Sequence, residues 1–200
     1  GIVIVPVGVE PRLKKSIFEI FHGGHPLPNY NSLHSGKKLV SFLNETTKND
    51  FVVFLISGGG SALSVNPDSI SLKDMIVVND VLFRSGANIM EIACIRKHLS
   101  LIKGGRLIQK MNCNGISFLI SDVIGDDLGS ISSGMTYCDK STFGDALRLV
   151  KKFSLEHKLP KSALSVLKSG LNGKRPETPK KPKIKNIILL NNSTCLFKMK

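Results

Sequence analysis

The chain has 200 residues, of which 42% are hydrophobic, and this length and composition suffice to bury the core of one α/β domain. It has no apolar run near the roughly 18 residues that a membrane-spanning helix requires, and its first nine residues lack the charged flank of a signal peptide, so we expect a soluble, cytoplasmic protein. The formal net charge is +13, but eight Lys or Arg and one Glu lie between Leu171 and Lys200. Because the excess lies in this tail, a solvated basic linker is a simpler interpretation than a nucleic-acid-binding surface.

The cysteines lie in or beside apolar segments and show no Cys-x-x-Cys spacing. They are Cys94, Cys113, Cys138 and Cys195. This pattern favours reduced, structural thiols over disulfides or a zinc site.

The first fifty residues predict two strand-like segments and one helix. Residues 23–29 contain two glycines and two prolines, so they cannot form regular structure, and Pro26 favours an extended conformation at His25. The expected elements are a buried strand over 1–8, a short helix or strand with a basic face over 11–21, and a helix capped by Asn31 or Ser32 that ends at Leu43.

The segment from Phe51 to Ala62 organises the rest of the chain. Six apolar residues, Phe51 to Ile56, predict a fully buried strand, and they lead into Ser57, Gly58, Gly59, Gly60 and Ser61. Three glycines let backbone N–H groups approach a ligand closely, and such amides favour an anion. The segment matches neither a Walker loop nor a G-x-G-x-x-G fingerprint, and a purely structural turn remains the alternative.

The remaining segments predict helices that alternate with two further strands. We expect a helix capped by Ser71 that stops near Gly86, two helices divided by a glycine pair over 91–107, a strand over 116–121, helices over 143–153 (capped by Ser141 or Thr142) and 159–170, and a strand over 184–190. Strands joined by about sixty residues of helix cannot form a hairpin, so the predicted fold is α/β, a three-layer Rossmann-like domain with a mostly parallel sheet. The expected boundaries are 1–170 for the domain, 171–183 for a Lys/Pro-rich linker and 184–200 for a strand that leads to a further domain.

Five potential cations fall within eleven residues of a mostly apolar segment. They are Arg96, Lys97, His98, Lys103 and Arg106. On a helix Arg96 and Lys103 would share one face, where like charges favour an anionic partner. A solvated basic face is an equally good interpretation, and for His98 alone a satisfied structural histidine is preferred.

Aspartates follow the predicted strand over 116–121, at the end where open α/β sheets bind ligands. Mg²⁺ is commonly held by one or two carboxylates together with substrate phosphates. Asp122 is the better candidate ligand and Asp126 the second, whereas a capping role is preferred for Asp127.

Several motifs in a fixed order resemble the glycerate 2-kinase family, the two-domain type whose second domain is called MOFRL. They cover nearly the whole chain and are Gly24–Pro28, Leu55–Leu63, Arg96–Ser100, Ile102–Leu107, Ser121–Val123, Gly125–Leu128, Ser133–Gly134, Thr142–Phe143 and Glu177–Lys180. Ile124 and Met135 depart from the family, which usually has proline there, and the segment 190–192 matches the family's Gly-Ser-Asn loosely.

The resemblance implies transfer of the ATP γ-phosphoryl group to the 2-hydroxyl of D-glycerate, in a cleft between two domains. It implies that Ser57 to Ser61 cradle phosphate and that His25 lines the cleft. The anion-binding set would be Arg96, Lys97, His98, Lys103 and Arg106, and Asp122 and Asp126 would hold Mg²⁺. The family's catalytic lysine would precede Gly1 and the MOFRL domain would follow Lys200, so we expect a fragment with part of the site; a homodimer is left open.

Two alternatives stay open. Members of the family have also been labelled hydroxypyruvate reductases, an activity that would require a dinucleotide fingerprint. A non-catalytic fragment could bind anions or nucleic acid through its basic tail, with a steep salt dependence.

Overall fold

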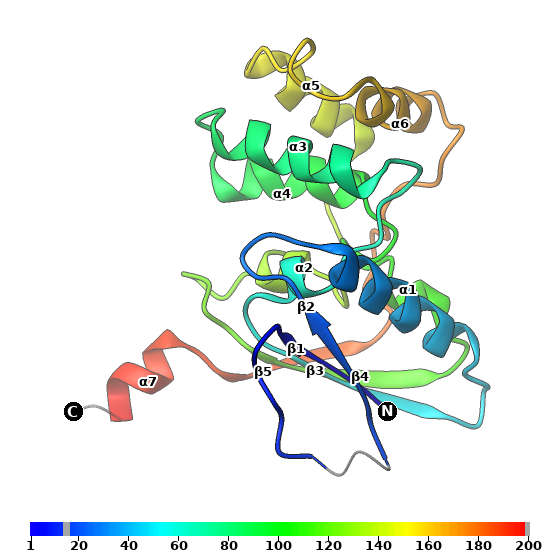
Figure 1. The fold of residues 1–200 in the computed structure, drawn as a ribbon, viewed down its shortest axis with the longest axis vertical. Helices are drawn as coiled ribbons and strands as arrows, with labels where there is room; N and C mark the ends of the chain where they lie inside the picture. The colour runs from blue at the N-terminus through cyan, green and yellow to red at the C-terminus, as the bar shows by residue number, and fades with distance from the viewer. Residues whose placement is uncertain (14–16, 199–200) are drawn as a thin grey trace.

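The computed structural model describes residues 1–13 and 17–198, which contain five strands in two sheets (Figure 1). One sheet pairs β1 (Ile2–Pro6) with β2 (Glu19–Gly23), and the other has the order β3 (Phe51–Ile56), β4 (Asn114–Ile120) and β5 (Lys185–Leu190). All pairings between these strands are parallel. The predicted α/β class with parallel strands is therefore confirmed.

Apart from α7, which lies beyond the end of β5, the α-helices form two groups (Figure 1). In Figure 1, α3 to α6 stack together at the top, and α1 and α2 lie between them and the strands. The elements are α1 (Tyr30–Asn44), α2 (Gly60–Leu63), α3 (Leu72–Phe83), α4 (Ile89–His98), α5 (Phe143–Lys152), α6 (Lys161–Leu171), α7 (Asn192–Lys198) and the 3₁₀ turns η1 (Ile108–Lys110) and η2 (Ile131–Ser133). Within the described ranges, no helix has both the length and the apolar character needed to cross a membrane.

Capping residues explain where the helices begin. Ser71 caps α3, as predicted, because its hydroxyl accepts a hydrogen bond from the Asp74 amide at 2.9 Å. The prediction for α1 was wrong: Asn29 is the cap, and its side chain accepts from the Ser32 amide at 3.0 Å. The hydroxyl of Ser32 accepts from the Asn29 amide in return and also from Gly24, which fixes the preceding loop on the helix.

Two apolar clusters form the core. The first lies among α3, α4, α5 and α6 and includes Leu82, Ile95, Phe143 and Leu167, each of which is almost fully buried. The second joins α1 and the residues around η1 to one face of β3, through side chains such as Leu43, Ile108 and Phe54. The chain therefore has a helical half and a sheet half, each with its own apolar cluster.

One face of β3 is exposed, so the prediction of a fully buried strand was wrong. Val52 and Phe54 pack against the core, whereas Phe51 and Leu55 are 63% and 79% exposed. Side chains alternate between the faces of a strand, and within the described residues the helices cover one face of this edge strand. A continuous apolar run does not reveal which of its members lack a covering layer.

Two other predictions can be compared with the structure. Of the helix or strand predicted over 11–21, a strand is found, because β2 begins at Glu19; residues 14–16 lie outside the described part of the chain. β2 runs on to Gly23, so the prediction that no regular structure includes residue 23 was wrong. Residues 172–184 form no helix or strand, as a linker would, but they are not simply solvated. Thr178 is buried, Glu177 and Arg175 bond to the helical half, and β5 then joins the same sheet as β4.

Candidate functional site

The carboxyl ends of β3 and β4 lie side by side and bring two of the predicted motifs together. The register pairs Ile56 with Leu119, so the loop after β3 lies next to the loop that contains Asp122. A Cβ placed on Gly58 would overlap the Asp122 carboxylate. The glycine at position 58 therefore leaves room for the Asp122 carboxylate beside the loop, and a larger residue there would displace that carboxylate.

The triglycine loop, Ser57 to Ser61, is held by hydroxyl groups from η2. Ser132 donates to the Ser57 carbonyl at 2.8 Å, and the hydroxyls of Ser61 and Ser133 lie 2.5 Å apart. Gly59 has a φ of +81°, and a Cβ there would lie 3.0 Å from the His25 Nε2 atom. The structure thus places His25 and the triglycine loop in contact.

The amides of this loop are available as donors. Between residues that the structure describes, the N–H groups of Gly58, Gly59, Gly60 and Ser61 donate no hydrogen bond. Consecutive free amides next to a partly open surface suit an anionic oxygen.

Lys103 contacts the same loop. Its side chain is 1% exposed, and its Nζ donates to the Ser61 carbonyl at 2.9 Å. Burial, together with the nearby charge of Arg96, holds the pKa of Lys103 well below its usual value. Arg96 is itself buried enough to lower the pKa of its guanidinium. When protonated, Lys103 adds positive charge beside the free amides and so favours an anion there.

Lys103 reaches the triglycine loop from a turn and not from the helix that the sequence predicted. α4 ends at His98, and Gly104 and Gly105 have φ of +58° and +79°, so residues 99–107 form turns instead of a second α-helix. The shared helical face predicted for Arg96 and Lys103 was wrong, because a 3.6-residue period does not continue past His98. The two cations meet because the chain turns back.

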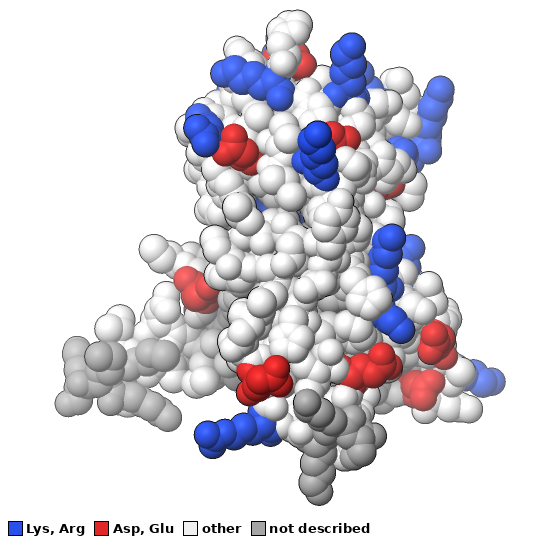
Figure 2. Space-filling view, viewed as in Figure 1, with Lys and Arg blue, Asp and Glu red and all other residues white. Residues whose placement is uncertain are grey.

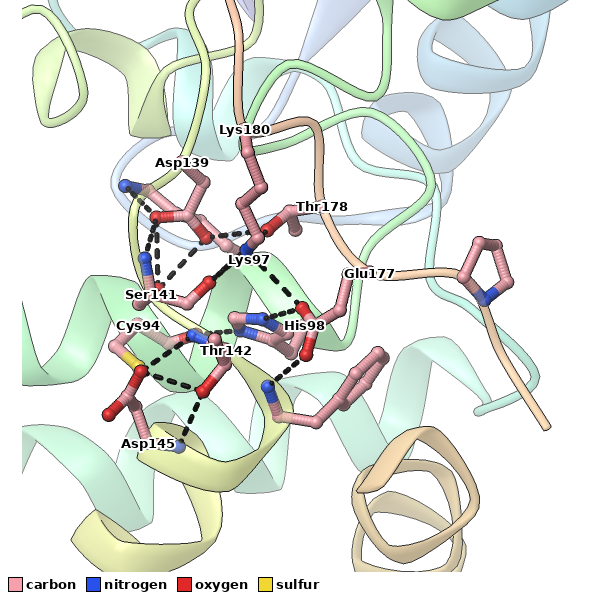
Figure 3. A network of polar contacts seen from close by, with 12 residues as sticks. Cys94, Lys97, His98, Asp139, Ser141, Thr142, Asp145, Glu177, Thr178 and Lys180 are labelled. Carbon is pink, nitrogen blue, oxygen red and sulfur yellow. Dashed lines mark hydrogen bonds and ion pairs between the residues drawn. The ribbon is translucent and has the colours of Figure 1, made fainter. Parts of the chain in front are cut away.

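Lys97 and His98 belong to a different set of contacts (Figure 3). The Lys97 ammonium forms a buried ion pair with Asp139 at 3.3 Å. His98 is fully buried, with one ring nitrogen on the Cys94 carbonyl at 2.8 Å and the other 3.2 Å from Glu177. These contacts join α4 to the segment before β5, which supports the structural interpretation of His98.

Glu177 also connects this network to α5. Its carboxylate accepts a hydrogen bond from the Phe143 amide at 2.8 Å. Partial burial raises the pKa of Glu177, but this amide and the charges of Lys180 and His98 outweigh it, and the pKa lies below its usual value. Thr178 adds a hydrogen bond to Asp139 at 3.1 Å (Figure 3).

The structure places Arg106 away from the triglycine loop. Its guanidinium donates to the Pro176 carbonyl at 2.9 Å and lies 3.8 Å from the Asp68 carboxylate. It therefore lines a separate cavity, although the sequence grouped it with Lys103.

The predicted metal ligands are only partly brought together. Asp122 is exposed beside Gly58, whereas Asp126 accepts a hydrogen bond from Asn191 at 2.6 Å. Within the described ranges, no three His, Cys, Asp or Glu side chains converge as a metal site. One exposed carboxylate beside free loop amides fits Mg²⁺ held mainly by a nucleotide's phosphates.

Three residues of this site were not predicted from the sequence. Ser132 and Ser133 hold the triglycine loop with φ of +47° and +59°, and Asn191 anchors Asp126 at the end of β5. The spacing of the two serines carries no recognisable signal. Ser133–Gly134 and the segment 190–192 were noted only for their resemblance to family motifs, with no role predicted for Ser133 or Asn191.

The comparisons with known proteins agree with these motifs. A family model described as "Domain of unknown function (DUF4147)" matches residues 1–168. The chain belongs to the DUF4147 family. One relative is a protein of Pyrococcus horikoshii that is named glycerate 2-kinase. It is 40% identical to this DUF4147 chain over 196 residues, which are 96% of this chain and 44% of the relative.

Two solved structures share the fold of this DUF4147 chain. A crystal structure of a Pyrococcus horikoshii protein matches with a TM-score of 0.91 and 40% identity, over 97% of this chain and 45% of the other. The crystal structure of glycerate kinase from Thermotoga maritima matches with a TM-score of 0.87 and 32% identity, over 100% of this chain and 47% of the other. The resemblance to the glycerate 2-kinase family is confirmed, and the chain spans a little under half the length of these relatives.

Proposed function

We propose that the protein containing this chain transfers the γ-phosphoryl group of ATP to the 2-hydroxyl of D-glycerate and forms 2-phosphoglycerate. In this reaction the hydroxyl oxygen forms a bond to the γ-phosphorus, and the bond from that phosphorus to the bridging oxygen of ADP breaks. The names of the relatives and the order of the motifs support the reaction. The observation that carries the proposal is the triglycine loop, whose four amides donate no hydrogen bond between described residues, with the buried Lys103 bonded to the Ser61 carbonyl of the same loop.

This part of the site would act by positioning and charge neutralisation, which phosphoryl transfer mainly requires. The amides from Gly58 to Ser61 would bind phosphate oxygens, and Lys103 and Arg96 would stabilise the charge that develops on them. His25 would line the site next to Gly59.

Asp122 is the residue that would hold Mg²⁺, because its carboxylate is exposed against the same loop. The ion would neutralise phosphate charge when bound. The sequence assigns no catalytic lysine within this chain, so the group that takes the hydroxyl proton is left to the rest of the protein. We retain a cytoplasmic location as a prediction and leave a homodimer open.

Calorimetry with Mg·ATP tests this proposal. We expect magnesium-dependent ATP binding. In Asp122→Asn this binding should become about tenfold weaker, because the phosphate-bound ion loses one protein ligand. Asp80→Asn is the matched control, because Asp80 is an exposed carboxylate of α3 paired with Arg84. Binding that is absent in the wild type, or equally weak in both variants, would contradict the proposed site.

NADH under the same conditions separates the kinase from a reductase. The sequence contains no dinucleotide fingerprint, so we expect no NADH binding. NADH binding without ATP binding would favour the reductase.

A nucleic-acid-binding protein is the less supported alternative. On the face drawn in Figure 2, the charged side chains are separated by wide uncharged areas and form no continuous basic surface. Four basic side chains do lie close together, but they line a cavity of about 460 Å³ and do not form an extended surface; they are Arg106, Lys110, Lys174 and Arg175.

A further inference from the structure

A second cationic site lies in a cavity that the proposed reaction does not use. The cavity has a volume of about 460 Å³ and is lined by Arg106, Lys110, Lys174 and Arg175, with Asp68 as its one carboxylate. Such a volume lies in the range of small-molecule sites. Four cations against one carboxylate leave an excess of positive charge that favours an anionic ligand.

The two guanidinium groups have unused donors. Arg106 has a side chain that is 8% exposed, and its Nε has no hydrogen-bond partner among the described residues. The Nε of Arg175 is likewise buried and unpaired, while its Nη1 donates to Asp68 at 2.6 Å. An arginine offers five N–H donors in a planar fork that suits phosphate and carboxylate oxygens. Most of these donors have no hydrogen-bond partner in the described part of the chain.

The positive charge continues into a neighbouring cavity of about 470 Å³. Lys161 and Lys168 line it from α6, one heptad apart and so on one helix face. Lys174 and Ser169 line both cavities. This second cavity has no acidic side chain in its lining, so the two together favour a ligand with several negative charges.

We propose that these two neighbouring cavities bind a small molecule that carries at least two phosphate groups. Arg106 and Arg175 bind one phosphate at the inner end beside Asp68, and Lys110 and Lys174 neutralise the next. Phosphate is the chemistry that concentrates enough negative charge in so small a volume. The site is separate from the triglycine loop, so it adds a phosphate site to the one used in the proposed reaction.

Titration calorimetry with pyrophosphate tests the proposal. We expect binding to the wild-type protein that becomes about tenfold weaker in Lys110→Ala/Lys174→Ala, because two cations that face the ligand are removed. Between described residues the side chains of these two lysines form no hydrogen bond or ion pair, and the backbone amide hydrogen bonds of Lys110 to Leu107 and of Lys174 to Ser169 are kept in alanine, so the variant should fold normally. Lys37→Ala/Lys73→Ala removes the same charge from exposed positions of α1 and α3 and should bind as the wild type does.

A third variant separates this site from the proposed kinase site. Gly59→Ala places a side chain at a φ of +81° against His25 and so distorts the triglycine loop. Pyrophosphate binding should persist in Gly59→Ala. Loss of binding in Gly59→Ala, with binding kept in the double lysine variant, would place the ligand at the triglycine loop and overturn the inference. Absent binding to the wild type, or equal weakening by the control pair, would also overturn it.

Lysine acetylation provides a measurement that does not depend on how Gly59→Ala folds. Pyrophosphate should protect Lys110 and Lys174 of the wild-type protein from acetylation, as read by mass spectrometry, and leave Lys37 and Lys73 unprotected. Equal acetylation with and without pyrophosphate would refute the site. A single-stranded oligonucleotide that binds more tightly than pyrophosphate at the same salt would instead indicate a nucleic-acid surface and refute the small-molecule assignment.

Discussion

Replacing Lys103 with methionine tests whether this buried cation serves binding more than folding. The Lys103 side chain is 1% exposed, its bond is to the Ser61 carbonyl, and no carboxylate pairs with it among the described residues. Methionine has a similar length and no charge. We therefore expect Lys103→Met to lose activity while the free energy of unfolding changes little.

The expected size of each effect follows from these contacts. Losing a hydrogen bond from a charged donor costs about 1.5–3 kcal/mol, and a volume-conserving swap costs less than about 1.5 kcal/mol. The substitution also removes the desolvation cost of burying an ammonium group that has no carboxylate partner, and this gain of several kcal/mol offsets the two losses. The net change in unfolding free energy should therefore stay within about 2 kcal/mol at pH 7. In contrast, kcat/KM should fall about 10² to 10³-fold, as when one transition-state donor is removed.

The pH dependence gives Lys103 a signature of its own. The pKa of Lys103 is lower in the folded protein than its usual value of 10.5. At a pH between the folded-state pKa and 10.5, the unfolded chain therefore binds one proton at Lys103 that the folded protein does not. The destabilising contribution is complete below the folded-state pKa and disappears as the pH rises to about 10.5. The unfolding free energy of the wild type should thus rise relative to Lys103→Met over this interval.

The measurements are steady-state kinetics with ATP and D-glycerate on the whole protein that contains this chain, and urea unfolding from pH 7 to 10. Lys73→Met, at an exposed lysine of α3, is the matched control and should change neither. Activity within twofold of the wild type would remove Lys103 from the site. A loss of unfolding free energy above about 4 kcal/mol would show that Lys103 is mainly structural. If the unfolding free energies of the wild type and Lys103→Met changed in parallel with pH, the lowered pKa of Lys103 would be refuted.

Two further predictions concern the helical half. In urea unfolding, Gly170→Ala should lower the unfolding free energy by about 1–3 kcal/mol, because the new Cβ would overlap the ring of the fully buried Phe143. Gly144→Ala is the control: its Cβ would have its nearest contact at 3.5 Å, so the unfolding free energy should change by less than about 1 kcal/mol. Equal effects of the two variants would contradict this packing. Burial raises the pKa of Cys94 to about 11, so the native thiol should resist iodoacetamide at pH 8 and react once urea unfolds the chain, as measured by mass spectrometry. Modification of native Cys94 at the unfolded rate would show that it is accessible.

Much of the fold could be predicted from local patterns. The parallel strands, the Ser71 cap and the Thr142 cap follow from apolar runs and side-chain hydrogen bonds within three residues. The capping of α1 could not be read in the same way, because Asn29 and Ser32 are both suitable and the loop before Asn29 decides between them.

The site was predictable where one segment carries the whole feature. The triglycine loop and Asp122 lie where strand ends were expected, since each follows its own strand directly. Arg106 and Lys103 were grouped by spacing, but the positive φ of Gly104 and Gly105 sends the two side chains to different places. Positive φ at glycine is a conformational option, and the sequence alone does not show when it is used.

The sheet order has a consequence for how this chain reaches its native state. β3, β4 and β5 are neighbours in space, but residues 57–113 and 121–184 separate them along the chain. Each pairing must therefore overcome the entropy of closing a long loop before it gains hydrogen bonds. A growing polypeptide that has not yet made Lys185 to Leu190 leaves one edge of β4 open to pairing with other chains. Aggregation during synthesis should therefore be greatest before β5 emerges and should decline once β5 covers that edge.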